Sequence, residues 1–182
     1  MRKTIIMTIV LLCAVVQGAW AQTWTNVTKE TLQSSIANNA YLRLTEDIQL
    51  SSYLNIDGKT VTIDLNGHKL SRSIPEYGSD GHVIYVHGGS TLTLTSSAED
   101  KGIIQGGMAN NGGAINIPHG NTVSATNVTF HRNSALKHGG AIWNNGTFTA
   151  TNCTFTENSC TDVGAIYNAL SDDGLYAQVP QP

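Results

Sequence analysis

Gly112-Gly113-Ala114-Ile115 returns in the sequence as Gly139-Gly140-Ala141-Ile142, and a degenerate copy follows as Val163-Gly164-Ala165-Ile166. Between these copies, Ala125-Thr126-Asn127-Val128-Thr129-Phe130 returns as Ala150-Thr151-Asn152-Cys153-Thr154-Phe155, and both copies continue as Phe-x-x-Asn. The repeating unit is about 25 residues long, which is too short to bury an apolar face of its own. Such units become stable by stacking on their neighbours. The repeat therefore predicts a solenoid.

Two kinds of solenoid have repeats of this length. A leucine-rich horseshoe needs recurring leucines and a helical arm in each unit, and the sequence has neither. In contrast, Val128 and Phe130 alternate with Thr129, as in a strand with one buried face, and the alternation recurs one unit later. Asn and Gly between such strands suit tight turns. We therefore expect an all-β chain folded as a parallel β-helix.

The composition agrees with a strand-rich solenoid. The 182 residues include 18 Gly, and only 13% of the residues are charged, against ~25% in average soluble domains. Thr, Asn and Gly are poor helix formers, and Thr favours strands. Ten Lys and Arg against 13 Asp and Glu leave no excess of positive charge. A basic nucleic-acid-binding protein is thereby excluded, because such proteins neutralise phosphates with cationic side chains.

Residues 1–21 have the three parts of a cleaved secretory signal. Arg2 and Lys3 form the positive end, an apolar run covers Ile5 to Val16, and Ala19-Trp20-Ala21 is a cleavage site of the A-x-A type. We expect cleavage between Ala21 and Gln22 and an extracellular or outer-membrane-surface location. No later apolar run reaches the ~20 residues that a membrane span needs, so no transmembrane anchor is expected in the mature chain.

The segment 22–50 is predicted to cap the solenoid, because an open end exposes backbone edges and core. We expect a short amphipathic helix at about 28–38, with Thr28 as its N-cap and with Val27 packed against Leu32. Residues 51–170 are predicted to form four to five coils, with a loop from Arg72 to Gly81. A loose tail, 171–182, follows, and a truncated C-terminus is one interpretation of it.

Gly-Gly-Ala-Ile together with Phe-x-x-Asn resembles the repeat signature of the polymorphic outer membrane protein family. The resemblance covers Gly112 to Ile166, whereas residues 54–104 are similar only to generic coils of the pectate-lyase-like fold group. It implies a right-handed parallel β-helix of the passenger type found in secreted and autotransported bacterial surface proteins. It also implies an adhesin or surface antigen as the function.

An outward-facing column follows from the repeat. If the Ile of each copy faces inward, the next residue points outward on the same face. These next residues are Asn116, Trp143 and Tyr167, on coils spaced ~4.8 Å apart. Aromatic rings in such a pair can stack on sugars or anchor a protein, so we select these three residues as the candidate binding site. Two alternatives remain open: the pair lies beneath the C-terminal segment, or the strand is turned over.

A carbohydrate-active enzyme is the rival interpretation, because β-helices also host polysaccharide lyases and glycoside hydrolases. Those enzymes need clustered carboxylates. The acidic candidates do not recur at the coil length; they are Asp57, Asp64, Asp80, Glu99, Asp100, Glu157 and Asp162. We therefore assign no catalytic residue and lean against catalysis. A truncated passenger fragment is the third interpretation.

Metal, cofactor and disulfide chemistry are not expected to define the function. The six histidines lack the spacing of a metal site, so neither a metal nor a cofactor is predicted. Cys153 and Cys160 replace Val128 and Ala135 in the repeat, which favours two buried free thiols over a disulfide. The expected partner is a glycan or a cell-surface protein, and the oligomeric state is left open.

Overall fold

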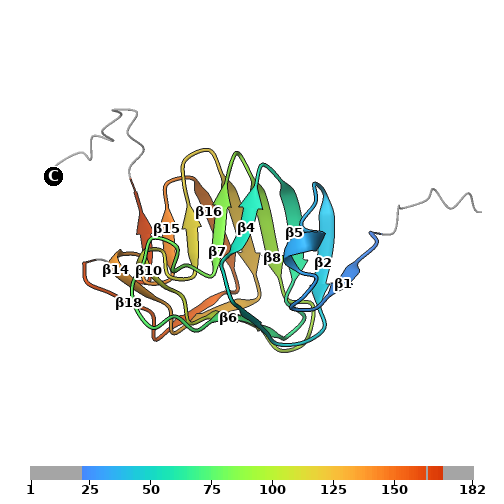
Figure 1. Cartoon of the computed structure of the whole chain (residues 1–182), viewed down its shortest axis with the longest axis horizontal. Coiled ribbons are helices and arrows are strands. Elements are labelled where there is room, and N and C mark those ends of the chain that lie inside the picture. Colours follow the sequence, from blue (N-terminus) through green and yellow to red (C-terminus); the bar gives the residue numbers. More distant parts are fainter. Residues whose placement is uncertain (1–21, 163, 170–182) are drawn as a thin grey trace, which may run out of the picture.

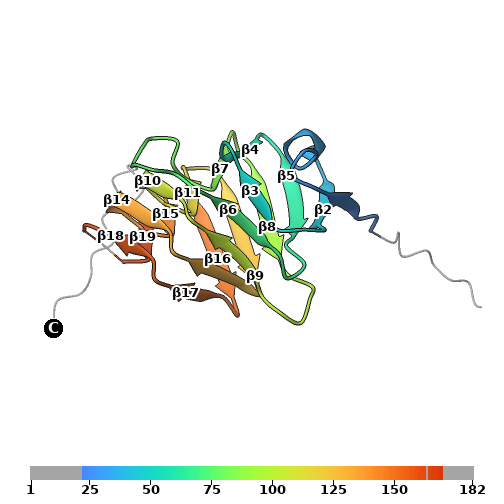
Figure 2. The ribbon, with the colours of Figure 1, turned by 60° about the horizontal axis from the view of Figure 1, so that its bottom comes forward.

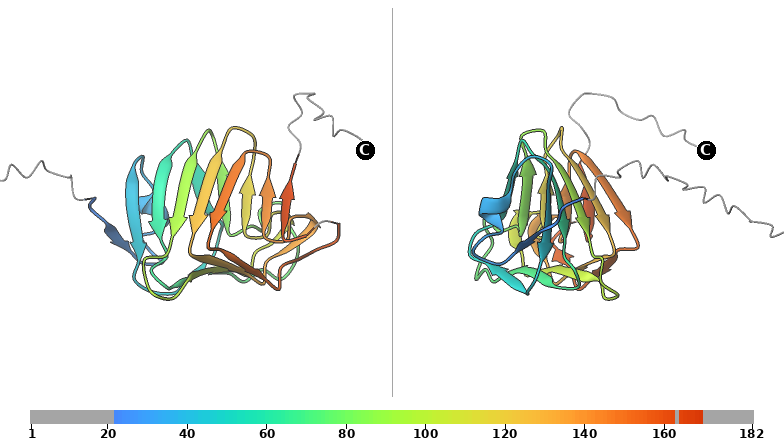
Figure 3. Two further views of the ribbon diagram at one scale, coloured as in Figure 1. Left: turned by 180° about the vertical axis from the view of Figure 1, so that it is seen from behind. Right: turned by 90° about the vertical axis from the view of Figure 1, so that its right-hand side faces the viewer.

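The computed structural model describes residues 22–162 and 164–169. Within them the chain is a parallel β-helix of five coils stacked along one axis, with the first coil at one end and the last at the other (Figure 1). End-on, the coils lie behind one another (Figure 3). The signal expected at 1–21 and the tail expected at 171–182 lie outside the described residues.

Three or four strands make up each coil. The first coil contains β2 (Ala40–Leu44), β3 (Ile48–Leu50) and β4 (Leu54–Asp57), and the second contains β5 (Thr60–Asp64), β6 (Lys69–Arg72) and β7 (Ile84–His87). The third contains β8 (Thr91–Thr95), β9 (Gly102–Gln105), β10 (Met108–Asn111) and β11 (Ile115–Ile117). The fourth contains β12 (Thr122–Thr126), β13 (Val128–His131), β14 (Ser134–His138) and β15 (Ile142–Asn144). The fifth contains β16 (Thr147–Thr151), β17 (Thr154–Thr156), β18 (Ser159–Cys160) and β19 (Ile166–Asn168).

Each strand pairs in parallel with the strand one coil further along, which produces four sheets. Sheet A has the order β1-β2-β5-β8-β12-β16, where β1 (Thr25–Val27) extends the sheet at its N-terminal edge. Sheet B has the order β17-β13-β9-β6-β3 and comes forward in Figure 2. Sheet C has the order β19-β15-β11-β7-β4, and sheet D has the order β10-β14-β18. The first coil already begins at Ala40, within the segment expected to be the cap.

Apolar side chains of successive coils stack inside the solenoid. Ile84, Ile115 and Ile142 are register partners on sheet C and are fully buried. On sheet B, Phe130 is fully buried and its ring stacks on Phe155, with centroids 4.8 Å apart and planes 10° apart. The alternation that predicted the strands is confirmed, because β13 alternates between buried and half-buried residues.

The two glycines of Gly-Gly-Ala-Ile have different physical roles. Gly112 and Gly139 both have φ of 62°, a left-handed conformation that glycine adopts without steric cost. Gly140 is needed for space, because a Cβ atom there would lie 2.5 Å from the backbone oxygen of Ser159 on the next coil. Gly113 meets the backbone of Gly140 in the same way. The motif thus turns the chain and lets neighbouring coils approach closely.

The Asn of Phe-x-x-Asn joins three coils at the corner between sheets B and D. Asn133 is fully buried, and its Nδ2 donates to the backbone oxygen of Ile104 and to Asn158 Oδ1, both at 3.0 Å. Its Oδ1 accepts a 3.2 Å hydrogen bond from the backbone N–H of Gly107. Asn158 repeats the pattern by donating to the oxygen of Phe130 at 2.8 Å. A buried amide at this corner satisfies backbone groups that a turn leaves unpaired.

The expected cap helix at 28–38 is wrong. The segment instead forms turns that lead into a short 3-10 helix, η1 (Gln33–Ser35). The Thr28 hydroxyl donates to Glu30 rather than capping a backbone N–H. The Gln33 side chain accepts from Asn55 N at 2.9 Å and donates to Asn55 O at 3.2 Å, so it satisfies the free edge of β4. Pairing with the free edge of β4 therefore competes with helix formation in this segment. Leu32 is fully buried and covers the N-terminal end of the core.

The loop expected from Arg72 to Gly81 is confirmed, since β6 ends at Arg72 and β7 begins only at Ile84. The loop lies along sheet D, where Gly78 forms an isolated parallel bridge with Ala109. The Tyr77 hydroxyl reaches Ser134 Oγ at 2.7 Å.

Both described cysteines, Cys153 and Cys160, are free thiols and half-buried. The expectation that both thiols are buried is not met, because each side chain is only partly covered.

Candidate functional site

The outward column predicted from the repeat lies on sheet C. Asn116 pairs in register with Trp143, and Trp143 pairs with Tyr167. All three side chains are half-buried, whereas the preceding Ile142 is fully buried. This excludes a turned-over strand at Trp143, whereas Ile166 on the last coil is 36% exposed. The alternative that the C-terminal segment covers the pair concerns residues 170–182, which lie outside the described residues.

The column continues beyond the three predicted residues. Tyr85 on β7 is the register partner of Asn116, and Asn55 on β4 is the partner of Tyr85. The sequence reasoning missed Tyr85 because coil two lacks the Gly-Gly-Ala-Ile motif by which the coils were aligned. The alternation in His82-Val83-Ile84-Tyr85-Val86 was the available signal.

A group of four side chains, called here the first histidine cluster, surrounds Tyr85. The rings of Tyr85 and His87 stack with centroids 4.5 Å and planes 20° apart. His87 Nε2 lies 2.7 Å from Asn55 Oδ1, and His87 Nδ1 lies 3.4 Å from Asp57 Oδ1. Because both ring nitrogens face oxygen atoms, the imidazole is fixed in orientation. Tyr85 is therefore held against a ring that cannot rotate freely.

A second histidine cluster of the same composition surrounds Tyr167. The rings of Tyr167 and His138 stack with centroids 4.5 Å and planes 23° apart. His138 Nδ1 lies 3.2 Å from Asn111 Oδ1, and His138 Nε2 lies 3.4 Å from Asp162 Oδ2. Thus the described part of the chain places a Tyr-His stack, rather than a stack of Trp143 on Tyr167, at this end of the column. Neither cluster was predicted from the sequence.

His82 is buried and packs against Tyr85 of the first histidine cluster. It is only 2% exposed and lies between the rings of Tyr53 and Tyr85, at centroid distances of 4.9 and 5.0 Å. Burial, followed by the nearby charge of Arg72, lowers the pKa of His82 to about 4, although Asp80 acts in the opposite direction. Neither of its ring nitrogens has a hydrogen-bond partner. His82 is therefore neutral at pH 7 and supports Tyr85 by packing.

Asn116 carries an acceptor without a partner in the middle of the column. Its Oδ1 is buried and makes no hydrogen bond. Leaving a buried acceptor unpaired costs about 1–3 kcal/mol.

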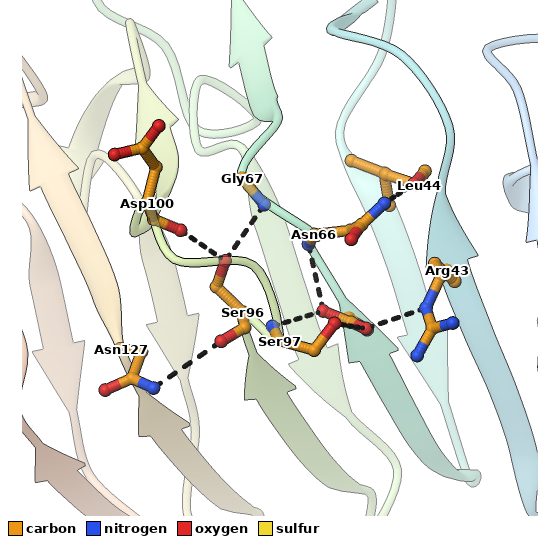
Figure 4. A network of polar contacts seen from close by, with 9 residues as sticks. Arg43, Leu44, Asn66, Gly67, Ser96, Ser97, Asp100 and Asn127 are labelled. Carbon is orange, nitrogen blue, oxygen red and sulfur yellow. Dashed lines mark hydrogen bonds and ion pairs between the residues drawn. The ribbon is translucent and has the colours of Figure 1, made fainter.

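Asp64, one of the acidic candidates, is structural rather than catalytic. It is fully buried on sheet A, where its Oδ1 accepts from the backbone N–H groups of Asn66 and Ser97, both at 2.9 Å (Figure 4). Its Oδ2 accepts from the Ser97 hydroxyl at 2.6 Å and from Arg43 Nε at 2.9 Å. Burial raises the pKa of Asp64, but these hydrogen bonds outweigh burial and hold it below its usual value. Both carboxylate oxygens of Asp64 are thus used in hydrogen bonds that join three coils.

The remaining acidic candidates are distributed over different coils and partners. Glu157 pairs with Arg132 at 2.7 Å on the exposed corner after sheet B, while Asp57 and Asp162 belong to the two histidine clusters. Glu99 and Asp100 lie in the loop between β8 and β9. Among residues 22–162 and 164–169, no group of three His, Cys, Asp or Glu side chains is placed to hold a metal ion.

Comparison with known proteins identifies one segment, residues 127–145, which covers the three strands of sheets B, D and C in coil four. The match is to the Chlamydia polymorphic membrane protein repeat. It contains one Phe-x-x-Asn and one complete Gly-Gly-Ala-Ile, the two motifs that carried the resemblance. The repeat and the parallel sheets together fit a passenger β-helix of the polymorphic membrane protein type. No curated protein and no solved structure matches the chain.

The described residues give no helical route into a membrane. Within 22–162 and 164–169, no helix is both long and apolar enough to cross a bilayer.

Proposed function

We propose that this protein is a secreted or surface-exposed β-helix module that binds a cell-surface glycan without cleaving it. The observation that supports this most is the register of Asn116, Trp143 and Tyr167, which places two aromatic rings and an amide on one outward face. Tyr and Trp combine a large apolar surface with a polar group, a combination suited to sugars. The polymorphic membrane protein repeat supports a surface location.

Enzymatic cleavage is the less favoured function. The carboxylates that a lyase or hydrolase would need lie in separate clusters or, in the case of Asp64, are fully used in hydrogen bonds. Fold alone does not supply an activity.

The test is retention of the protein on an immobilised panel of neutral and acidic polysaccharides. We expect the wild-type protein to be retained by at least one of them, and we expect the double variant Trp143→Ala/Tyr167→Ala to lose retention. Released material should contain no new reducing or unsaturated ends if the protein binds the polysaccharide without cleaving it.

The matched control removes another aromatic pair from a different face. Trp24 and Tyr41 contact each other edge-to-face at 5.7 Å, and Tyr41 lies on sheet A. The variant Trp24→Ala/Tyr41→Ala should be retained like the wild type. Retention that survives loss of Trp143 and Tyr167, or the absence of any retention, would refute binding at this site; polysaccharide fragments would instead indicate an enzyme.

A further inference from the structure

We propose that the binding face of sheet C is a row of subsites for one linear, uncharged glycan chain, with Tyr85 at one end and Tyr167 at the other. This inference rests on the proposed function and specifies the ligand of the same site. It follows from two features outside the predicted residues, the matched histidine clusters and the absence of cationic residues from the face.

The two histidine clusters are equivalent in chemistry although they come from different coils. Each contains a tyrosine stacked at 4.5 Å on a histidine, together with an Asn and an Asp that contact the histidine. In both, the Asp oxygen lies 3.4 Å from a ring nitrogen. A flat ring beside hydrogen-bonding side chains can contact the apolar face of a sugar while the polar groups bind its hydroxyls. The first cluster lies on β4 and β7 of sheet C, whereas the second joins Tyr167 of sheet C to Asn111 and His138 on β10 and β14 of sheet D. The two tyrosines thus provide two like subsites near the two ends of the sheet C column.

The subsites lie in line. Tyr85, Asn116, Trp143 and Tyr167 are register partners on four successive coils. With ~4.8 Å between coils, the column from Tyr85 to Tyr167 spans ~14 Å along the solenoid axis. A single sugar cannot contact both ends of such a column. A chain of several linked sugars lying across the strands would contact both ends and would also pass over Trp143.

Acceptors along this line are available for sugar hydroxyls. The side chains of Asp57 and Asp162 are 61% and 53% exposed, so each carboxylate retains oxygen surface beyond its contact with histidine. These two acceptors lie near the two ends of the column.

The charge of the face selects against acidic chains. The five strands of sheet C carry no Lys or Arg among their residues, which are LNID, IYVH, INI, IWN and IYN. The exposed carboxylates of Asp57 and Asp162 stand at the two ends. A polyuronate would bring its own carboxylates next to these, and like charges in contact oppose binding. The ligand that fits is therefore a neutral glycan.

The experiment measures affinity as a function of chain length by calorimetry, using cello- and chito-oligosaccharides from the disaccharide to the hexasaccharide. The wild-type protein should bind the hexasaccharide about tenfold or more tightly than the trisaccharide, because an additional aromatic subsite is occupied. Tyr85→Ala should remove this gain, so that its affinities for the hexasaccharide and the trisaccharide become similar. Tyr85→Phe, which keeps the ring, should retain the gain, and Tyr41→Ala serves as the control on sheet A.

An oligogalacturonate of the same length should bind about tenfold more weakly than the neutral chain.

The outcomes separate this inference from the proposed function. If Tyr85→Ala leaves hexasaccharide affinity unchanged while Trp143→Ala/Tyr167→Ala abolishes binding, the row of subsites is refuted and the proposed function stands. Tighter binding of the oligogalacturonate would refute the uncharged ligand. If the wild-type protein binds none of the glycans of either panel, both proposals fail.

Discussion

At the scale of single residues, Asp64 shows how a buried charge is stabilised in this fold. Its carboxylate accepts four hydrogen bonds, from Asn66, Arg43 and twice from Ser97. Asp64→Asn replaces one acceptor oxygen by a donor that would face Ser97 or Arg43. We expect a loss of about 1–3 kcal/mol in unfolding free energy, measured by urea denaturation. The exposed carboxylate of Asp57 is the control, and an Asp57→Asn variant as unstable as Asp64→Asn would contradict this account.

The pH dependence of the Asp64 contribution has a defined sign. Because hydrogen bonds hold the folded-state pKa of Asp64 below the unfolded value of ~3.9, its stabilisation is present above that value. The stabilisation is lost as the pH falls through the folded-state pKa. The Asp64→Asn variant should therefore approach the wild-type stability only in strong acid.

His82 should make the protein less stable in mild acid. Its folded-state pKa of about 4 lies below the unfolded value of 6.5, so between these pH values the unfolded chain binds an additional proton. Stability should fall as the pH is lowered through 6.5, by up to about 3 kcal/mol near pH 4. Urea midpoints of the wild type and of His82→Phe, compared at pH 7 and pH 5, measure this. If the midpoint of His82→Phe decreases between the two pH values as much as that of the wild type, His82 is not the cause.

At the scale of elements, the coil corners depend on close backbone approach. Gly140→Ala places a methyl group 2.5 Å from the oxygen and 2.8 Å from the nitrogen of Ser159, so the turn at Gly140 and β18 must separate. We expect a loss of about 1–3 kcal/mol in unfolding free energy. Gly78→Ala is the matched control, because the nearest atom to a Cβ there lies 4.0 Å away. Equal urea midpoints for the two variants would show that the corner tolerates the methyl group.

The repeat made coils three to five predictable, including the register that aligns Asn116, Trp143 and Tyr167. It could not predict the first histidine cluster, because Asn55 and His87 are 32 residues apart and the second coil has a loop in place of the Gly-Gly motif. The cap helix was mispredicted for a different reason. Local patterning favoured a helix, whereas Gln33 instead pairs with the open edge of β4, a tertiary contact that composition does not reveal.

At the scale of the whole molecule, abundant threonine hydrates a surface that carries few charged residues. Thr60, Thr91, Thr122 and Thr147 are register partners on the outward side of sheet A. Further Thr residues follow at alternate positions of the same strands. Their hydroxyls give sheet A a polar, hydrated surface along the solenoid, while the outward rings of Tyr85, Trp143 and Tyr167 lie on sheet C. The two faces thus divide hydration and the proposed recognition between them.

The strand pairing described above also determines how the molecule would respond to force. Hydrogen bonds between parallel strands are slanted but join one strand to the next, so here they point from coil to coil, roughly along the solenoid axis. Tension applied along that axis opens one interface between coils at a time, instead of shearing many bonds together. The weakest interface therefore sets the rupture force, and a longer stack of coils would extend further without becoming mechanically stronger.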